Sequence, residues 1–174
     1  MKAPKQSRHG HLVTALAFAA GALSVCAAAP AYAVLGGEPM TAPDGATSTN
    51  AVVRAATPNG ASGVSAATAS NYTVRTTTLA SGTTINEYLT TEGVVFGIAW
   101  HGPRVPDLAS LLGSYFPQYQ EGLKAQRAAR GGRGPVSVES SGLVVRSVGH
   151  MGSFAGSAYL PQSLPAGVSV TDIQ

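Results

Sequence analysis

The sequence predicts an α+β domain, in which an antiparallel meander sheet carries one main amphipathic helix and a short second helix on one face. Residues 71–100 contain three runs of β-branched and aromatic side chains separated by glycine-containing turns, which is typical of consecutive strands. Residues 108–119 then repeat large apolar side chains at helical spacing. Residues 71–174 are enough for one small domain and too few for two.

The second and third predicted strands form a hairpin around a two-residue turn at Glu92 and Gly93. The cross-strand pairs that this turn predicts are Ile85 with Trp100, Glu87 with Ile98, and Leu89 with Phe96. Both faces of residues 94–100 are apolar, so this strand is predicted to lie in the centre of the sheet.

The helix is predicted to begin after Pro106, with Asp107 as its N-terminal cap. Its apolar stripe consists of Leu108, Leu111, Leu112, Tyr115, Phe116 and Tyr119. Pro117 predicts a break or kink, and a second short helix follows over residues 118–129. Residues 135–148 predict one strand or a broken pair, and residues 153–161 predict the last strand.

The N-terminus predicts a secretory signal peptide over residues 1–33. A basic start without acids precedes the apolar residues 12–29, and Ala-Tyr-Ala at residues 31–33 predicts cleavage after Ala33. An uncleaved anchor and lipidation at Cys26 are the alternatives. The apolar stretch is rich in alanine, however, and the bulky Val25 does not fit a lipobox. We therefore expect a periplasmic or secreted protein with no membrane span after cleavage.

Residues 34–70 are predicted to form a flexible segment, because residues 41–70 consist almost entirely of alanine, threonine, serine, glycine and proline. The apolar patch at residues 34–39 is expected either to pack as a strand or to remain loose.

Cleavage after Ala33 would leave eight basic and eight acidic residues, so the mature chain would have no net charge. This balance gives no support to binding of nucleic acid. Cleavage would also remove Cys26, the only cysteine, and with it any disulfide or thiolate chemistry. The sequence contains no dinucleotide or P-loop fingerprint, so no cofactor is predicted.

Two long segments resemble a known family. They are "GVVFGIAWHGPRVPDLASLLGSYFPQY", residues 93–119, and "LVVRSVGHMGSFAGSAYLPQSLPAGVSVTDIQ", residues 143–174. Together they look like the secreted proteobacterial proteins grouped as domain of unknown function 2844. The resemblance also includes the signal peptide and the "LGG" motif, whereas the long alanine-, serine- and threonine-rich segment is less typical. It implies a location in the cell envelope and assigns no activity, because the family has none established.

Glu87 is a candidate buried acid, because it lies between Ile85 and Leu89 on the predicted core face. A three-residue loop before it would place Arg75 opposite Glu87, and a two-residue loop would place Thr76 there. An ion pair or an exposed edge position is favoured over catalysis.

Basic side chains recur every third residue at Lys124, Arg127, Arg130 and Arg133, and they are candidates for anion binding. The alternative is that these cations stabilise a helix C-terminus that ends in glycine.

A second candidate cluster depends on whether two strand ends meet in space. Its members are His101, Arg104, Asp107, Arg146 and His150. The two histidines lie in glycine-flanked turns, but two histidines and one aspartate form an incomplete metal site. We therefore predict no metal and no catalytic residue, and favour local hydrogen bonds to the backbone together with helix capping by Asp107.

These observations favour an exported, non-enzymatic binding or structural module that acts on an envelope protein or a surface polymer. One alternative is an anionic-polymer binder that uses the arginine-rich loop. The other is an enzyme or metal protein that uses His101 and His150. The sequence leaves the oligomeric state open.

Overall fold

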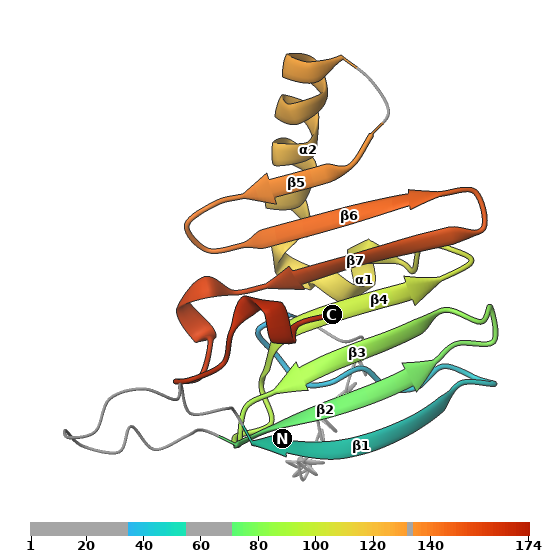
Figure 1. Ribbon diagram of the computed structural model, residues 1–174, viewed down its shortest axis with the longest axis vertical. Coiled ribbons are helices and arrows are strands. Elements are labelled where there is room, and N and C mark those ends of the chain that lie inside the picture. Colours follow the sequence, from blue (N-terminus) through green and yellow to red (C-terminus); the bar gives the residue numbers. More distant parts are fainter. Residues whose placement is uncertain (1–34, 55–70, 132–133) are drawn as a thin grey trace, which may run out of the picture.

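A seven-stranded antiparallel sheet forms the centre of the protein, with the strand order β1-β2-β3-β4-β7-β6-β5 (Figure 1). This computed structural model describes residues 35–54, 71–131 and 134–174, so Cys26 lies outside the described residues. The strands are β1 (Thr47–Arg54), β2 (Asn71–Thr78), β3 (Thr84–Leu89), β4 (Val95–Gly102), β5 (Val136–Glu139), β6 (Val144–His150) and β7 (Ser153–Tyr159). The predicted α+β class is confirmed, and β4 occupies the middle of the sheet as its two apolar faces predicted.

The predicted hairpin between β3 and β4 is confirmed at two pairs and wrong at the third. Ile85 and Glu87 have their predicted partners, but a register shift places Leu89 opposite Val95 instead of Phe96. The β-bulge inserts Phe96 as an extra residue in β4. The side chains of Val95 and Phe96 therefore point to the opposite faces of the sheet from those predicted. As a result, Val95 packs in the helix-side core and Phe96 in the core on the opposite face.

A helical segment of 23 residues packs on one face of the sheet, behind β4 to β7 in Figure 1. It consists of α1 (Leu108–Leu112), the 3-10 turn η1 (Gly113–Tyr115) and α2 (Phe116–Arg130). The break predicted from Pro117 lies at η1, because a proline fits the first turn of the following helix, where no backbone N–H is needed. Within the described residues, no helix combines the length and the apolar character that crossing a membrane requires.

The helix contacts the sheet through its predicted apolar stripe. Leu111, Leu112 and Tyr119 are buried in one core with residues of β3 to β7. Farther along α2, Gly122 lies against Val138 of β5, where a side chain on Gly122 would collide with the valine. A glycine at this position therefore lets the helix backbone approach the edge of the sheet closely.

Residues 34–70 differ from the predicted flexible segment in two places. Leu35 is 1% exposed, and the backbone of residues 35–37 bonds to both α1 and β4, although it forms no strand. Residues 47–54 form β1, which pairs with β2 along its whole length. Backbone hydrogen bonds do not depend on side-chain type, so β1 forms even though it lacks a strong apolar stripe. Residues 55–70 lie outside the described residues.

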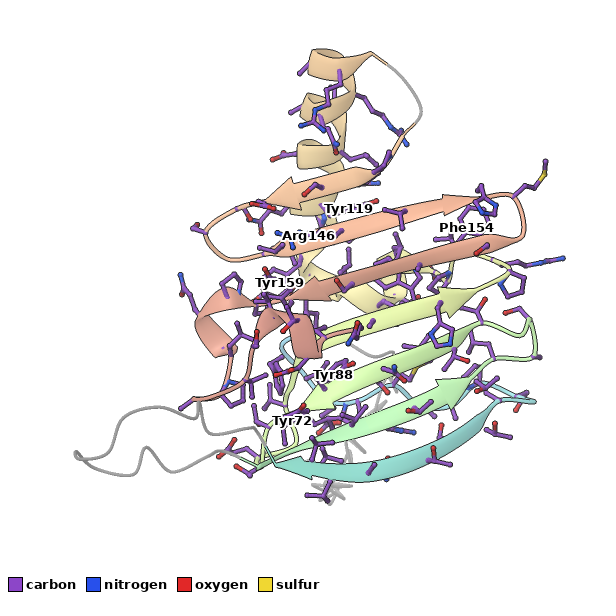
Figure 2. The ribbon with its side chains drawn as sticks, in the orientation of Figure 1. Tyr72, Tyr88, Tyr119, Arg146, Phe154 and Tyr159 are labelled. Carbon is purple, nitrogen blue, oxygen red and sulfur yellow. The ribbon has the colours of Figure 1, made fainter. Side chains whose placement is uncertain are left out.

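Part of the second face of the sheet is covered by the C-terminal residues 160–174. Of these, sequence reasoning assigned only residues 160 and 161 to an element, as the end of the last strand. They contain the 3-10 turns η2 (Pro161–Ser163) and η3 (Val170–Asp172). Ile173 packs against the backbone of Gly97, and the Tyr88 hydroxyl donates to the Gln174 carbonyl over 2.8 Å. In Figure 2 the tail crosses the front of the sheet near the labelled Tyr88.

Candidate functional site

The helix-side face of the sheet is covered over β4 to β7 but carries an open polar groove over β1 and β2. The groove has a volume of about 320 Å³. It is lined by Pro39, Ser48, Asn50, Thr73, Arg75, Leu89, Thr90, Thr91 and Gly93. Most of these side chains carry a hydroxyl, amide or guanidinium group. We call this feature the polar groove.

Glu87 lies beside the polar groove and is 0% exposed. The backbone N–H of Met40 donates to Glu87 Oε1 over 2.7 Å. Arg75 is paired with Glu87 across β2 and β3, as the three-residue loop predicted, and its Nε lies 4.0 Å from Oε2. Among the described residues, Oε2 has no hydrogen-bond partner. The buried carboxylate is therefore only partly compensated.

Burial raises the pKa of the Glu87 carboxyl above its ordinary value, and this effect outweighs the Met40 N–H and the Arg75 charge, which lower it. Glu87 consequently takes up a proton more readily than an exposed glutamate. When it does so, the positive charge of Arg75 loses its counter-charge. The charge beside the polar groove therefore depends on pH.

Arg75 connects the buried acid to the polar groove. Its side chain is 21% exposed and lines the groove, and within the described residues its guanidinium forms no hydrogen bond. Ser48 and Asn50 lie on β1 beside it, and the Ser48 hydroxyl is 2.8 Å from that of Thr77. Arginine N–H groups are donors only, whereas hydroxyl and amide groups both donate and accept. The groove thus suits an oxygen-rich ligand that both accepts and donates hydrogen bonds.

Most of the chain matches the model of one protein family. The model of the family described as "Protein of unknown function (DUF2844)" matches residues 31–173. The chain belongs to this family. No curated protein and no solved structure gives a significant match. The family's description names no activity, so the function of this DUF2844 protein must be argued from its own surface.

The predicted histidine cluster is divided between different places in the DUF2844 fold. His101 and Arg146 line one shallow hollow of about 250 Å³ on the tail side of the sheet. His150 lies at the same end of the sheet, but β7 separates its strand from that of His101. The Nδ1 atom of His150 is 3.4 Å from the Met151 carbonyl oxygen.

The remaining members of that cluster have local roles. Asp107 Oδ1 accepts the N–H of Ala109 over 3.0 Å, which caps α1, and the carbonyl of Arg104 accepts the Thr83 hydroxyl. In the described part of the chain, no hydrogen bond or ion pair joins any two of the five cluster residues. No group of three or more histidine, cysteine, aspartate or glutamate side chains gathers there as a metal site.

The basic residues of α2 are exposed as a group. Lys124, Arg127 and Arg130 lie in the C-terminal half of α2, the helix whose end projects past β5 in Figure 1. Arg127 and Arg130 also line an open groove of about 770 Å³ between α2 and β5. Arg133 lies outside the described residues.

Sequence reasoning identified Glu87 and one loop length that places Arg75 opposite it, but it missed the polar groove. One side of the groove is formed by Ser48 and Asn50 of β1, whose residues were assigned to the flexible segment. The alternation of Ser48, Asn50 and Val52 along one face was the only available signal, and it is weak because most residues there are small and polar.

Proposed function

We propose that this DUF2844 protein is an exported, non-enzymatic binding module of the cell envelope, and that its polar groove binds a hydroxyl-rich glycan. The signal-peptide pattern of residues 1–33 supports export. Leu35, two residues after the predicted cleavage site, belongs to the buried core, so a cut after Ala33 would leave a chain that folds from its first residues.

The observation that carries this proposal is the free hydrogen-bonding capacity of Arg75. In the described structure, a partly buried guanidinium without a hydrogen bond faces a groove of hydroxyl and amide groups. The exposed part of this guanidinium can exchange water for the hydroxyl oxygens of a ligand, since its N–H groups are donors only. Leu89 and Pro39 add apolar contact area for the carbon faces of sugar rings.

Binding is tested by co-sedimentation of the purified protein with peptidoglycan sacculi. The test variant is Arg75→Met combined with Glu87→Gln, because removing both charges leaves no buried carboxylate without its counter-charge. We expect the double variant to bind at least about tenfold more weakly than the wild type. Glu87→Gln alone is the matched control and should retain binding, since Arg75 is still present. Equal binding by wild type and double variant would contradict the proposal.

A second candidate function is binding of an anionic envelope polymer by α2. The observation that favours it is the exposed row of Lys124, Arg127 and Arg130 on a projecting helix, in which no cation forms an ion pair with a described acid. Retention on heparin should then fall with added salt and with Arg127→Ala plus Arg130→Ala. Retention that this double variant leaves unchanged would exclude the second function.

A further inference from the structure

The two edges of the sheet differ in how their backbone groups are satisfied. At the β5 edge, the Gln126 side chain accepts the N–H of Ser137 and donates to the carbonyl of Pro135, each over 3.1 Å. One amide side chain of α2 thus takes the place of a neighbouring strand. The β5 strand is also only four residues long, so this edge is short and closed.

The β1 edge is long and open in the described structure. The strand has eight residues in continuous register with β2, and no described segment pairs with its outer side. Residues 47–53 contain no charged residue and no proline, and their pairing with β2 shows no bulge. Natural proteins normally protect exposed edges with one of these devices. Val52 is moreover 77% exposed at this edge, although it is apolar.

We propose that a second copy of this chain pairs with the β1 edge, so that two antiparallel β1 strands join two sheets into one. A two-fold axis perpendicular to the sheet presents the same backbone edge from both copies, which is the geometry of the commonest homo-oligomers. The one charged residue of β1 is Arg54 at its end, so a two-fold axis through the middle of the strand keeps the two arginines at opposite ends of the pair.

The side chains of β1 favour a second copy over a foreign peptide. Peptides that add a strand to a sheet edge gain specificity from pockets for alternate side chains. On its helix side, β1 offers only the short polar Ser48 and Asn50 beside Val52. The same axis keeps these residues of both copies on one face, so the exposed Val52 is covered and the two polar grooves become neighbours. This inference does not depend on what the grooves bind.

One strand pair buries less surface than the roughly 1,200–2,000 Å² of stable interfaces, so the dimer is expected to be weak. Sedimentation equilibrium of the purified protein from about 1 µM to about 1 mM should show reversible association within this range. Val52→Lys should raise the dissociation constant at least about tenfold, since it places like charges across the two-fold axis.

Val148→Lys is the matched control, because Val148 is also an exposed valine, at 53%, but lies on the interior strand β6. It should leave association unchanged. A dimer that both lysine variants leave intact would place the interface elsewhere and overturn the proposal.

Hydrogen exchange of the β1 amides at low and high concentration provides the second measurement. We expect the outward amides to become protected only as the concentration rises. Fast exchange at every concentration in a monomeric protein would overturn the proposal. Protection at every concentration in a monomer would also overturn it, because another part of the same chain would then cover the edge.

Discussion

The helix-side face of the sheet has two parts. The helical segment covers one part, which we call the dry half, and leaves the other open to solvent, which we call the wet half. Over β4 to β7, side chains such as Trp100 and Val145 are buried beneath Leu111, Leu112 and Tyr119 of the helical segment. Over β1 and β2, the same face of the same sheet carries a polar groove. The segment of residues 35–40 lies between the two halves and bonds to both Val95 and Glu87.

Two buried side-chain atoms have no hydrogen-bond partner among the described residues. Trp100 Nε1, a neutral donor, lies in the dry half, whereas Glu87 Oε2, which carries charge when ionised, lies on β3 beside Arg75 at the border of the wet half. An unpaired neutral group costs less free energy than an unpaired charge. The comparison indicates that the dry half supplies most of the stability, whereas the wet half retains groups whose state responds to pH and ligand.

The largest effect is expected from Leu112→Ala in the dry half. Leu112 of α1 is fully buried against the sheet, so its truncation should lower the free energy of unfolding by about 2–5 kcal/mol through lost burial and a residual cavity. Chemical denaturation measures this loss. Asn50→Ala is the control in the wet half and should change stability by no more than about 0.5 kcal/mol. Equal decreases in the free energy of unfolding for the two variants would show that the two halves do not differ in their contribution to stability.

A smaller effect is expected at the point where the helix of the dry half begins. Asp107 caps α1 and also accepts the hydroxyl of Ser110 over 2.5 Å. These hydrogen bonds hold the pKa of the Asp107 carboxyl below its ordinary value. Asp107→Ala should lower stability by about 1 kcal/mol in thermal or chemical unfolding. Asp107→Asn retains a capping oxygen and should lose less, and an alanine variant as stable as wild type would rule out this role.

The smallest effect at low pH, and the most diagnostic of the wet half, is expected from Glu87→Gln. Because burial raises the folded-state pKa of Glu87, the folded protein binds this proton more tightly than the unfolded chain. The contribution of Glu87 to stability is therefore most favourable below its ordinary pKa and decreases as the pH rises through the raised value. Glu87→Gln should remove this decrease and flatten the profile of stability against pH.

This profile is obtained from denaturation midpoints measured at intervals above pH 4.5. The ordinary pKa of a glutamate carboxyl is 4.5, so the decrease in stability is expected above this pH. Glu92→Gln is the control, since this residue is exposed and hydrogen bonds lower the pKa of its carboxyl. A Glu87→Gln profile as steep as that of the wild type would show that the buried acid does not set the pH response.

Elements whose side chains repeat at a clear period could be predicted from the amino-acid sequence alone. The apolar stripe from Leu108 to Tyr119 predicted the helix, Asp107 predicted its cap, and the turn at Glu92 and Gly93 predicted most of the register between β3 and β4. These features depend on neighbours within a few residues, and such local preferences are present in the sequence itself.

The segments that cover each face of the sheet and the strand that pairs at its edge could be identified only from the folded structure. The β1 strand has few large apolar side chains, and its hydrogen bonds to β2 come from the backbone, which every residue shares. The tail over Tyr88 and the bulge that turns Phe96 away from the helix also result from contacts between distant residues. Because the polar groove depends on β1, its position follows from this pairing and not from any local motif.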